Sequence, residues 1–335
     1  MNNRPFGIAL FGAGRIGKVH ARNIADHRDC RLKFVVDPVA ASADELAAAH
    51  GAAVGDEASV LTALETDAIV IASATSTHAD LIEKGLAAGK AVFCEKPIDL
   101  DIDRVDACLA LALASDRPLF LAFNRRFDPA IAELKRRIDS GAIGNLELLT
   151  VTSKDPGALP IEYLKVSGGM FRDMTIHDFD MVRFILGEEP VAVTATAAAL
   201  TDPAIKAEGD IDTACVTLQT GSGKIAIISN SRRASFGYDQ RVEAHGSLGT
   251  LRTENVPQSM LVQERGDGIR REKPLFFFLE RYAQSYRDEW DYFVRVLKGE
   301  EPPAPSGEDG RKALLLAEAA YRSLQTGQRI NLANV

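Results

Sequence analysis

The sequence predicts an α/β domain with a parallel sheet, followed by an α+β domain with a large, mostly antiparallel open sheet. Three observations lead to this prediction. The chain has 335 residues, of which 46% are hydrophobic, and this length is typical of two domains rather than one. Apolar runs alternate with helical patterns through the first third of the chain, as in a parallel sheet with helical crossovers. The second half instead contains strand-like runs separated by turn signals, which indicates antiparallel pairing.

The chain begins with a strand, a glycine-rich loop and a helix. Phe6–Phe11 is an apolar run, and a helical pattern from Lys18 to Asp26 follows the loop. The loop has Gly-x-Gly-x-x-Gly spacing and consists of Gly12, Ala13, Gly14, Arg15, Ile16 and Gly17. In such a loop the first glycine permits the tight turn, the second lets the backbone approach a pyrophosphate, and the third allows close helix packing. This order of elements predicts a Rossmann domain whose loop binds a dinucleotide at the helix N-terminus.

The second strand, Leu32–Val36, ends in a carboxylate that suits NAD. Asp37 follows the last glycine of the loop by about twenty residues, the spacing found in such domains. A carboxylate at this position accepts hydrogen bonds from the adenosine ribose and repels a 2′-phosphate, so we expect NAD rather than NADP. The competing interpretation is that Asp37 is only a turn residue before Pro38.

The third strand, Ala68–Ala72, is wholly apolar, as a strand buried on both faces requires. Helices are expected around it over residues 43–50, 58–65 and 79–88. Ligands of open α/β sheets bind at the carboxyl ends of the strands, and this strand leads into a polar segment. The candidate cofactor-binding residues of that segment are Ser73, Thr75, Ser76 and His78. The competing interpretations are a structural role for His78 and helix capping for Thr77.

The fourth strand, Ala91–Cys94, leads into the tripeptide Glu95-Lys96-Pro97. Proline restricts the residue before it and cannot continue a sheet ladder, so Lys96 is expected in an extended turn at the carboxyl edge. The nicotinamide should lie at this edge, which makes Glu95 and Lys96 candidate cofactor-binding residues. The competing interpretation of Lys96 is an exposed loop cation.

The first domain is expected to end near residue 123. A helix over 103–115 and a strand over 118–123 complete its alternating pattern, and the sequence then changes character at Asn124–Pro129. We therefore divide the chain into a Rossmann domain, residues 1–123, and an α+β domain for substrate binding and oligomerisation, residues 124–335.

The second domain contains a series of short strand-like runs. Strands are expected over residues 146–153, 191–196, 213–219, 224–230, 241–245 and 260–263. Asp155 follows the first of these runs, and Tyr238 lies in a loop before the fifth; taken alone, both are ordinary loop residues. Helical patterns cover 276–296 and 307–324, and Tyr282 and Tyr286 are expected in the core or in an interface, with ligand contact as the alternative.

The stretch Gly168–Asp180 combines a flexible glycine pair with a polar helix face. If Thr175–Leu186 is a helix, Asp173, His177 and Asp180 recur at the spacing of one helix face, opposite an apolar side. Such a carboxylate, imidazole and carboxylate face indicates either a salt-bridged surface or the wall of a polar pocket.

Composition excludes several classes of partner. The formal net charge is -8 and the pI is about 5.4, so neither nucleic acid nor an anionic membrane is expected to bind. The four cysteines lack Cys-x-x-Cys spacing, so we expect buried thiols rather than disulfides or a metal site. No run of eighteen apolar residues and no signal-peptide core are present, which favours the cytoplasm. A small molecule is the expected ligand.

The motifs together resemble the Gfo/Idh/MocA oxidoreductase family over essentially the whole chain. The resemblance is carried by the glycine-rich loop, by Glu95-Lys96-Pro97, and by Gly168-Gly169 leading to Asp173 and His177. Among the members of that family, Phe123–Asp128 and Gly237–Arg241 are most similar to the inositol dehydrogenases.

This resemblance implies NAD-dependent oxidation of myo-inositol to its 2-ketone by a homotetramer. It implies that Lys96, Asp173 and His177 are catalytic, with His177 as general base, since a histidine near its ordinary pKa suits the proton step. Substrate-binding residues implied by the resemblance are Lys96, Arg126, Asp155, Asp173, His177 and Tyr238. The alternatives are a dehydrogenase of another inositol isomer or an aldopyranose, and a dinucleotide-binding regulator without activity.

Overall fold

The computed structural model describes residues 4–157 and 160–334, which form two compact units. The first unit consists of the chain up to Asn124 together with Tyr286–Leu314, and the second consists of Arg125–Ser285 together with the chain from Leu315 onward. The predicted division after residue 123 did not foresee that the chain returns. Residues 286–314, which we assigned to the second domain, instead belong to the first unit.

The first unit contains a six-stranded sheet with the order β3-β2-β1-β4-β5-β6, in which all neighbours pair in parallel. Its strands are β1 (Phe6–Phe11), β2 (Cys30–Val36), β3 (Ala53–Val54), β4 (Ala68–Ile71), β5 (Ala91–Glu95) and β6 (Leu119–Ala122). The order reverses between β1 and β4, so the loops that follow these two strands lie at the switch point where dinucleotides bind. The predicted Rossmann fold is confirmed.

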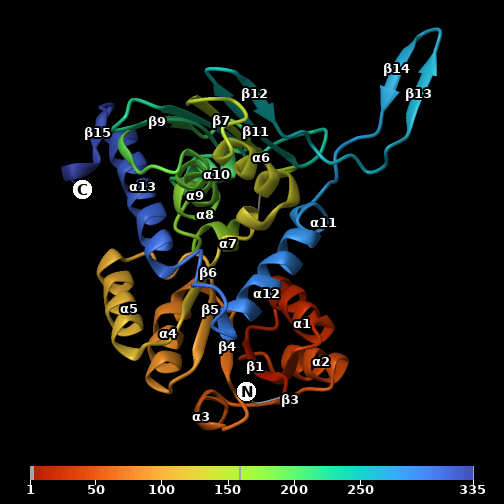
Figure 1. The fold of residues 1–335 in the computed structure, drawn as a ribbon, viewed down its shortest axis with the longest axis vertical. Coiled ribbons are helices and arrows are strands. Elements are labelled where there is room, and N and C mark those ends of the chain that lie inside the picture. Colours follow the sequence, from red (N-terminus) through yellow and green to blue (C-terminus); the bar gives the residue numbers. More distant parts are fainter. Residues whose placement is uncertain (1–3, 158–159, 335) are drawn as a thin grey trace. The chain divides into compact units, whose positions relative to one another are not determined.

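Helices cover both faces of this sheet (Figure 1). They are α1 (Arg15–Asp26), α2 (Ala40–His50), α3 (Glu57–Thr62), the 3₁₀ turn η1 (Thr75–Thr77), α4 (His78–Ala87), α5 (Ile102–Ser115) and most of α12 (Ala283–Leu297). On one face the rings of His20 from α1 and Trp290 from α12 contact Phe93 of β5, with centroids 5.0 and 5.8 Å away. Helices α4 and α5 pack together on the other face. The returning helix α12 therefore completes the core of the first unit.

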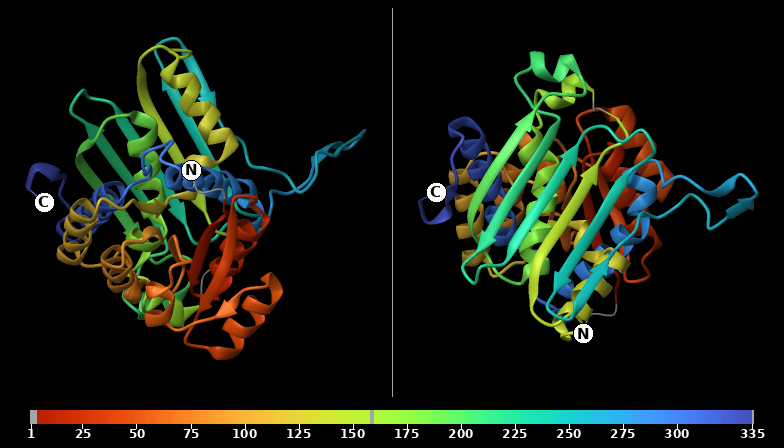
Figure 2. Two further views of the ribbon diagram at one scale, coloured as in Figure 1. Left: turned by 60° about the horizontal axis from the view of Figure 1, so that its bottom comes forward. Right: turned by 90° about the horizontal axis from the view of Figure 1, so that it is seen from above.

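The second unit is built on a seven-stranded sheet with the order β12-β11-β7-β10-β9-β8-β15 (Figure 2). Its strands are β7 (Leu146–Lys154), β8 (Pro190–Ala198), β9 (Thr213–Thr220), β10 (Ile225–Ser231), β11 (Asp239–Gly246), β12 (Gly249–Arg252) and β15 (Ile330–Asn331). The prediction of a mostly antiparallel sheet needs correction, because the sheet is mixed: β7 and β10 pair in parallel at its centre. The reason is the connection after β7. Helices carry the chain back to the edge where β7 begins, and the meander β8-β9-β10 then ends beside β7 in the same direction.

The helices of the second unit include one that matches its prediction. They are α6 (Pro129–Asp139), α7 (Ile161–Leu164), α8 (Met170–Asp173), α9 (Thr175–Leu186), α10 (Pro203–Ala207), α11 (Phe278–Arg281), the later part of α13 (Gly307–Thr326) and two 3₁₀ turns, η2 (Asn124–Phe127) and η3 (Leu332–Asn334). Helix α9 has the predicted bounds and packs against β7 and β10. The single helix expected over 276–296 is instead divided into α11 and α12. Within residues 4–157 and 160–334, no helix is long and apolar enough to cross a membrane.

We expected the run 260–263 to form a strand of the large sheet, but it does not. The strands β13 (Val262–Arg265) and β14 (Gly268–Arg271) pair only with each other and form a hairpin that projects from the second unit (Figure 1). Every residue of both strands is exposed. The strand-like run that predicted a strand of the large sheet therefore has no core beneath it.

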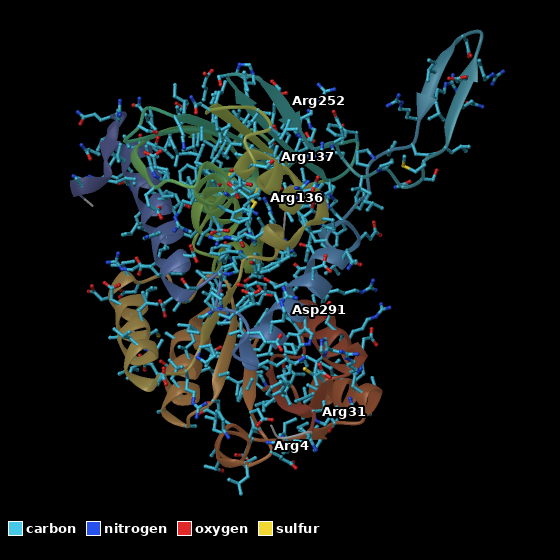
Figure 3. The ribbon with its side chains drawn as sticks, viewed as in Figure 1. Arg4, Arg31, Arg136, Arg137, Arg252 and Asp291 are labelled. Carbon is cyan, nitrogen blue, oxygen red and sulfur yellow. The ribbon has the colours of Figure 1, made fainter. Side chains whose placement is uncertain are left out.

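Many surface charges of the second unit form local pairs. Arg136 and Arg137 lie on α6 (Figure 3), and both contact Glu133 at 2.7 Å. Exposed pairs of this kind contribute about 0–1 kcal/mol each, so they do not determine the fold. The charges that matter for the architecture are the buried ones.

Glu289 is a buried carboxyl group of the first unit. Its side chain on α12 is 0% exposed, and neither carboxyl oxygen has a hydrogen-bond partner among the described residues. Burial raises the pKa of Glu289 well above its ordinary value, and the negative charge of nearby Glu95 raises it further. The folded protein therefore keeps this group neutral at a pH where the unfolded chain has ionised it.

We predict that Glu289 makes the first unit less stable as the pH rises. Its folded-state pKa is raised, so its contribution is fully present below the unfolded pKa of about 4.3 and is lost toward the folded pKa. Relative to Glu289→Gln, the free energy of unfolding of the wild type should fall by up to about 1.4 kcal/mol per pH unit in this window. Urea unfolding followed by fluorescence of Trp290, the single tryptophan, measures this.

The matched control is Glu264→Gln on the exposed hairpin, which should follow the wild type at every pH. Parallel stability curves for wild type and Glu289→Gln between pH 5 and 8 would contradict the prediction.

Candidate active site

The glycine-rich loop has the geometry of a phosphate cradle. Gly12 has φ +106°, and a Cβ there would lie 2.4 Å from the carbonyl oxygen of Ala72, so the loops after β1 and β4 touch. A Cβ at Gly17 would lie 2.0 Å from the Gly12 oxygen, which explains why this glycine is needed inside α1. At Gly14, by contrast, no described heavy atom lies within 4 Å of such a Cβ. Gly14 precedes the N-terminus of α1, so this open position suits an approaching phosphate.

Asp37 lies beside this loop and stabilises it directly. Its two carboxylate oxygens accept hydrogen bonds from the backbone N–H groups of Ala13, at 2.6 Å, and Val39, at 2.8 Å. Asp37 is therefore held at the carboxyl end of β2, next to the glycine turn. This is the position from which a carboxylate reaches an adenosine ribose, and contact with the ribose stays a prediction.

The polar segment after β4 forms the second part of the carboxyl edge. Ser73, Thr75 and Ser76 lie in or before the turn η1, where Ser73 Oγ is 2.7 Å from Thr77 Oγ1. Thr77 does not cap α4 through its side chain, because its hydroxyl donates to the carbonyl of Ala74 at 2.8 Å. The three cofactor-binding assignments in this segment stay predictions.

His78 is a buried residue that supports the turn after β5. Its Nδ1 lies 2.7 Å from the carbonyl oxygen of Pro97, and its Nε2 lies 3.2 Å from that of Ser73. Burial lowers the pKa of His78, so the ring is neutral and donates to one carbonyl at a time. The geometry gives His78 a structural role between two loops of the edge, and its predicted contact with the cofactor is untested.

Glu95 and Lys96 lie at the end of β5, on the same edge of the sheet. Glu95 Oε1 is 2.7 Å from Nε2 of His20, a fully buried residue of α1. This pair fixes the last residue of the strand, and the His78 contact fixes Pro97. Both neighbours of Lys96 in the chain are thus fixed, which holds Lys96 in the turn at the carboxyl edge where the sequence predicted it.

In the second unit, Asp173 ends α8 and His177 lies in the first turn of α9. Asp173 is 8% exposed, and its Oδ1 accepts a hydrogen bond from Tyr163 Oη at 2.8 Å. The third residue of the expected face, Asp180, has a different role. It is fully buried and accepts a bidentate pair from Arg126, whose Nε lies at 2.8 Å. That carboxylate is structural, and substrate binding by Arg126 stays a prediction.

Sequence reasoning missed Asp178, the residue next to His177. Its carboxylate is fully buried and accepts hydrogen bonds from Arg125 Nη1 at 2.6 Å, Ser153 Oγ at 2.6 Å and Asn230 Nδ2 at 2.8 Å. Ser153 belongs to β7 and Asn230 to β10, so one carboxylate joins α9 to both parallel strands. This network fixes the helix that carries His177. The sequence signal was an aspartate on the apolar side of the helix.

Sequence reasoning also missed a clamp, formed by Tyr321 and Glu318 of α13, that holds the segment around the glycine pair. Tyr321 Oη accepts a hydrogen bond from the backbone N–H of Phe171 at 3.3 Å and lies 3.4 Å from the Gly168 oxygen. One turn earlier, Glu318 forms a bidentate pair with Arg172, in which Nη2 lies at 2.7 Å. The flexible glycine pair before Asp173 is therefore held by a helix about 150 residues away in sequence. No local pattern could have indicated this.

The parallel pair β7 and β10 brings two further residues to one edge of the sheet. Asp155 follows β7 and Arg232 follows β10, and Tyr238 precedes β11, which pairs antiparallel with β7. Burial raises the pKa of Asp155 to about 6, although the charges of Arg232 and Arg125 oppose this shift. Tyr238 is buried against Tyr282, with ring centroids 6.0 Å apart. Substrate binding by Asp155 and Tyr238 stays a prediction, but the edge they share also contains the unforeseen Arg232.

Comparison with known sequences matches most of the chain, in two parts, to a single family. A profile described as "Oxidoreductase family, NAD-binding Rossmann fold" matches residues 6–123, and one described as "Oxidoreductase family, C-terminal alpha/beta domain" matches residues 135–332. The chain belongs to the Gfo/Idh/MocA oxidoreductase family. Both halves of the resemblance seen in the sequence are confirmed.

Several members of the Gfo/Idh/MocA family are similar along their full length. The inositol 2-dehydrogenase of Rhizobium meliloti (strain 1021) is 51% identical over 97% of this chain and 99% of the relative. The myo-inositol 2-dehydrogenase of Thermotoga maritima is 42% identical over 98% of this chain and 99% of the relative. The crystal structure of scyllo-inositol dehydrogenase from Lactobacillus casei with bound NAD(H) and scyllo-inositol has a TM-score of 0.91 at 30% identity, covering 98% of this chain and 100% of that one.

The residues of the first unit fit the cofactor of this family, NAD. The open position at Gly14, the α1 N-terminus and the Asp37 carboxylate are all at the switch point of the sheet. The glycine-rich loop would hold the pyrophosphate and Asp37 the adenosine ribose.

We predict that alanine at Gly14 and at Gly17 separates cofactor binding from folding. Gly14 has φ -72°, which alanine adopts readily, and the added methyl would occupy the space of the pyrophosphate. Gly14→Ala should keep the wild-type melting temperature and weaken NAD binding by about tenfold or more, a cost of about 1.4 kcal/mol. Gly17→Ala should destabilise the first unit by about 1–3 kcal/mol, because its methyl collides with backbone.

Calorimetric titration with NAD and thermal unfolding of both variants measure the two effects. Wild-type affinity for NAD in Gly14→Ala would show that the pyrophosphate does not approach this residue.

Proposed function

We propose that the protein oxidises myo-inositol to 2-keto-myo-inositol (scyllo-inosose) with NAD as hydride acceptor. The observation that carries this proposal is the pair of relatives named as inositol 2-dehydrogenases, at 51% and 42% identity over nearly the whole chain. The residues quoted for the family resemblance support it, since Lys96, Asp173 and His177 are all present. The structure adds an edge of the second unit at which a carboxylate, a guanidinium and a phenol gather.

In the proposed reaction, His177 removes the proton of the reacting hydroxyl. A general base must be held in one orientation, and the buried Asp178 network fixes the helix on which His177 lies. Asp173 orients and polarises the imidazole or holds a neighbouring hydroxyl. Lys96 stabilises the developing alkoxide. When bound, NAD supplies the acceptor for the hydride.

A neutral polyol suits the acidic groups of the second unit better than an anionic substrate. Asp155 and Tyr238 are the proposed partners of substrate hydroxyls, together with Arg126. A ring with several hydroxyl groups can satisfy many buried donors and acceptors, and an analogue that leaves one of them unmatched is rejected strongly.

Another inositol isomer is the second candidate substrate. The observation in its favour is the Lactobacillus casei structure, a relative with a TM-score of 0.91 that holds scyllo-inositol. An aldopyranose is the third candidate, and a regulator without activity is the alternative from a different class. NADH formation by the purified protein with myo-inositol, scyllo-inositol, glucose and galactose distinguishes them. Turnover of glucose without turnover of myo-inositol would refute the proposed substrate, and no turnover of any polyol would favour the regulator.

We predict that His177 and Lys96 act in chemistry rather than in stability. Each replacement by alanine should lower kcat by about 10²- to 10⁴-fold, the usual loss for one acid–base or electrostatic group, with little change in melting temperature. His50→Ala is the matched control, because this histidine ends α2 in the first unit, away from the proposed site and the open sheet face, and should be dispensable. Near-wild-type turnover in either catalytic variant would remove that residue from the proposed mechanism.

We also propose that the cytoplasmic form is a homotetramer in which the open face of the seven-stranded sheet is buried. Exposed and buried side chains alternate along the central strands β9 and β10, and Ile225 of β10 is 40% exposed. Light scattering at micromolar concentration should give four times the chain mass of 36.2 kDa. Thr217 is exposed on β9 near the middle of this face, so Thr217→Arg should dissociate the tetramer. Glu208→Arg, exposed beyond α10, is the control; a monomeric wild type would exclude the proposal.

A further inference from the structure

Arg232 is a fully buried cation at the carboxyl end of β10. Its side chain is 0% exposed, and its Nη2 donates to Oδ2 of Asp173 at 3.2 Å. Its backbone N–H donates to the carbonyl of Asp212 at 2.8 Å, which fixes the start of the side chain. Among the described residues, its Nε and Nη1 have no hydrogen-bond partner. A guanidinium buried this deeply with a single ion pair is costly for stability and therefore calls for a functional explanation.

Arg232 lies between two acidic residues of the candidate site. Asp173 is bound directly, and the backbone N–H of Asp155 donates to the carbonyl of Ser231 at 2.9 Å, the residue before Arg232. The second oxygen of Asp173 accepts from Tyr163, so the carboxylate is held from two sides in a defined orientation. The parallel pairing of β7 and β10 produces this arrangement, since it brings both strand ends to one edge.

The charge of Arg232 favours the ionised form of the Asp155 carboxyl group. Burial raises the pKa of Asp155 to about 6, and the Arg232 and Arg125 charges limit that rise. The titratable and charged groups of this unit that face Asp155, Asp173 and Arg232 include Arg125, Tyr163, Asp178, Tyr238 and Tyr321. Arg232 contacts Asp173 directly. Loss of the Arg232 charge should make Asp155 easier to protonate and leave the Asp173 carboxylate without this ion pair.

We propose that Arg232 is a positioning residue of the dehydrogenase, which orients the Asp173 carboxylate and keeps Asp155 ionised at neutral pH. The proposal rests on the function proposed above, because it assigns Asp173 to the orientation of His177 and Asp155 to substrate hydroxyls. An Asp173 carboxylate without the Arg232 contact would lose its defined orientation, and a protonated Asp155 would lose one acceptor for the substrate. Arg232 thereby sets the lowest pH at which the site can work.

The test is the pH profile of kcat/KM in Arg232→Met and Arg232→Lys. In Arg232→Met the acidic limb should move about 1 pH unit upward, and kcat/KM at pH 7 should fall about 100-fold, the usual effect of a misplaced catalytic group. Arg232→Lys keeps the charge, so its limb should stay near the wild-type position. Arg233, the exposed neighbour of Arg232, provides the matched control. Arg233→Met should retain the wild-type kcat/KM and the wild-type position of the acidic limb.

A purely structural role predicts a different result. Activity would then fall together with the melting temperature while the limb keeps its wild-type position, and this outcome in Arg232→Met would overturn the proposal. If Arg232→Met does not fold, Arg232→Lys decides. A lowered kcat with a wild-type acidic limb and a wild-type melting temperature supports the proposal, whereas a kcat that falls only together with the melting temperature, or does not fall at all, excludes it.

Carbon-13 NMR titration of labelled aspartates separates this proposal from the substrate assignment. With Asp155→Asn used to assign the signal, the pKa of Asp155 should be higher in Arg232→Met than in the wild type, whatever substrate the enzyme uses. An unchanged Asp155 titration would refute the role of Arg232. A raised value in a protein that turns over no polyol would refute the proposed function instead.

Discussion

The arrangement of the second unit depends on one buried carboxylate, that of Asp178. Its three hydrogen-bond partners come from the start of the unit and from two strands, so helix α9 has a fixed register on the sheet. Removing one partner of such a buried charge costs about 3–5 kcal/mol, because the charge is left uncompensated. Apolar packing alone would permit α9 to slide or rotate slightly. The ionic contact removes that freedom one residue away from the proposed general base.

In both units, candidate functional residues follow the carboxyl ends of parallel strands and therefore lie at one edge of the sheet. In the first unit the ends of β1, β2, β4 and β5 supply the cofactor loop, Asp37, the polar segment and Lys96. Among the described strands of the second unit, β7 and β10 are the only neighbours that pair in parallel, and their ends supply Asp155 and Arg232. An all-antiparallel sheet would send these two side chains to opposite edges. The single parallel pair is therefore what makes a mixed site possible there.

Local sequence patterns predicted those features that local physics determines. The glycine-rich loop, the first-unit strands and helix α9 follow from residue spacing and periodicity over fewer than about twenty residues. Most failures involve long-range pairing: the parallel contact of β7 with β10, the return of residues 286–314, and the Tyr321 and Glu318 clamp on the glycine pair. Arg232 was missed for the same reason, since its significance appears only when Asp173 is beside it. The run 260–263 was placed in the wrong sheet because a strand-like run indicates a strand but does not identify the strand it pairs with.

The return of the chain to its first unit has a consequence for biosynthesis. A ribosome completes the six parallel strands after little more than a third of the chain, yet the aromatic face of β5 stays uncovered until α12 has emerged. The nascent dinucleotide domain therefore waits for the whole second unit to be translated, with Phe93 lacking Trp290 and Phe293 as neighbours. Shortening the gene at the apparent domain boundary would yield a fragment with this apolar surface exposed, prone to aggregation. The first unit can therefore complete its core only after the chain has been synthesised through α12.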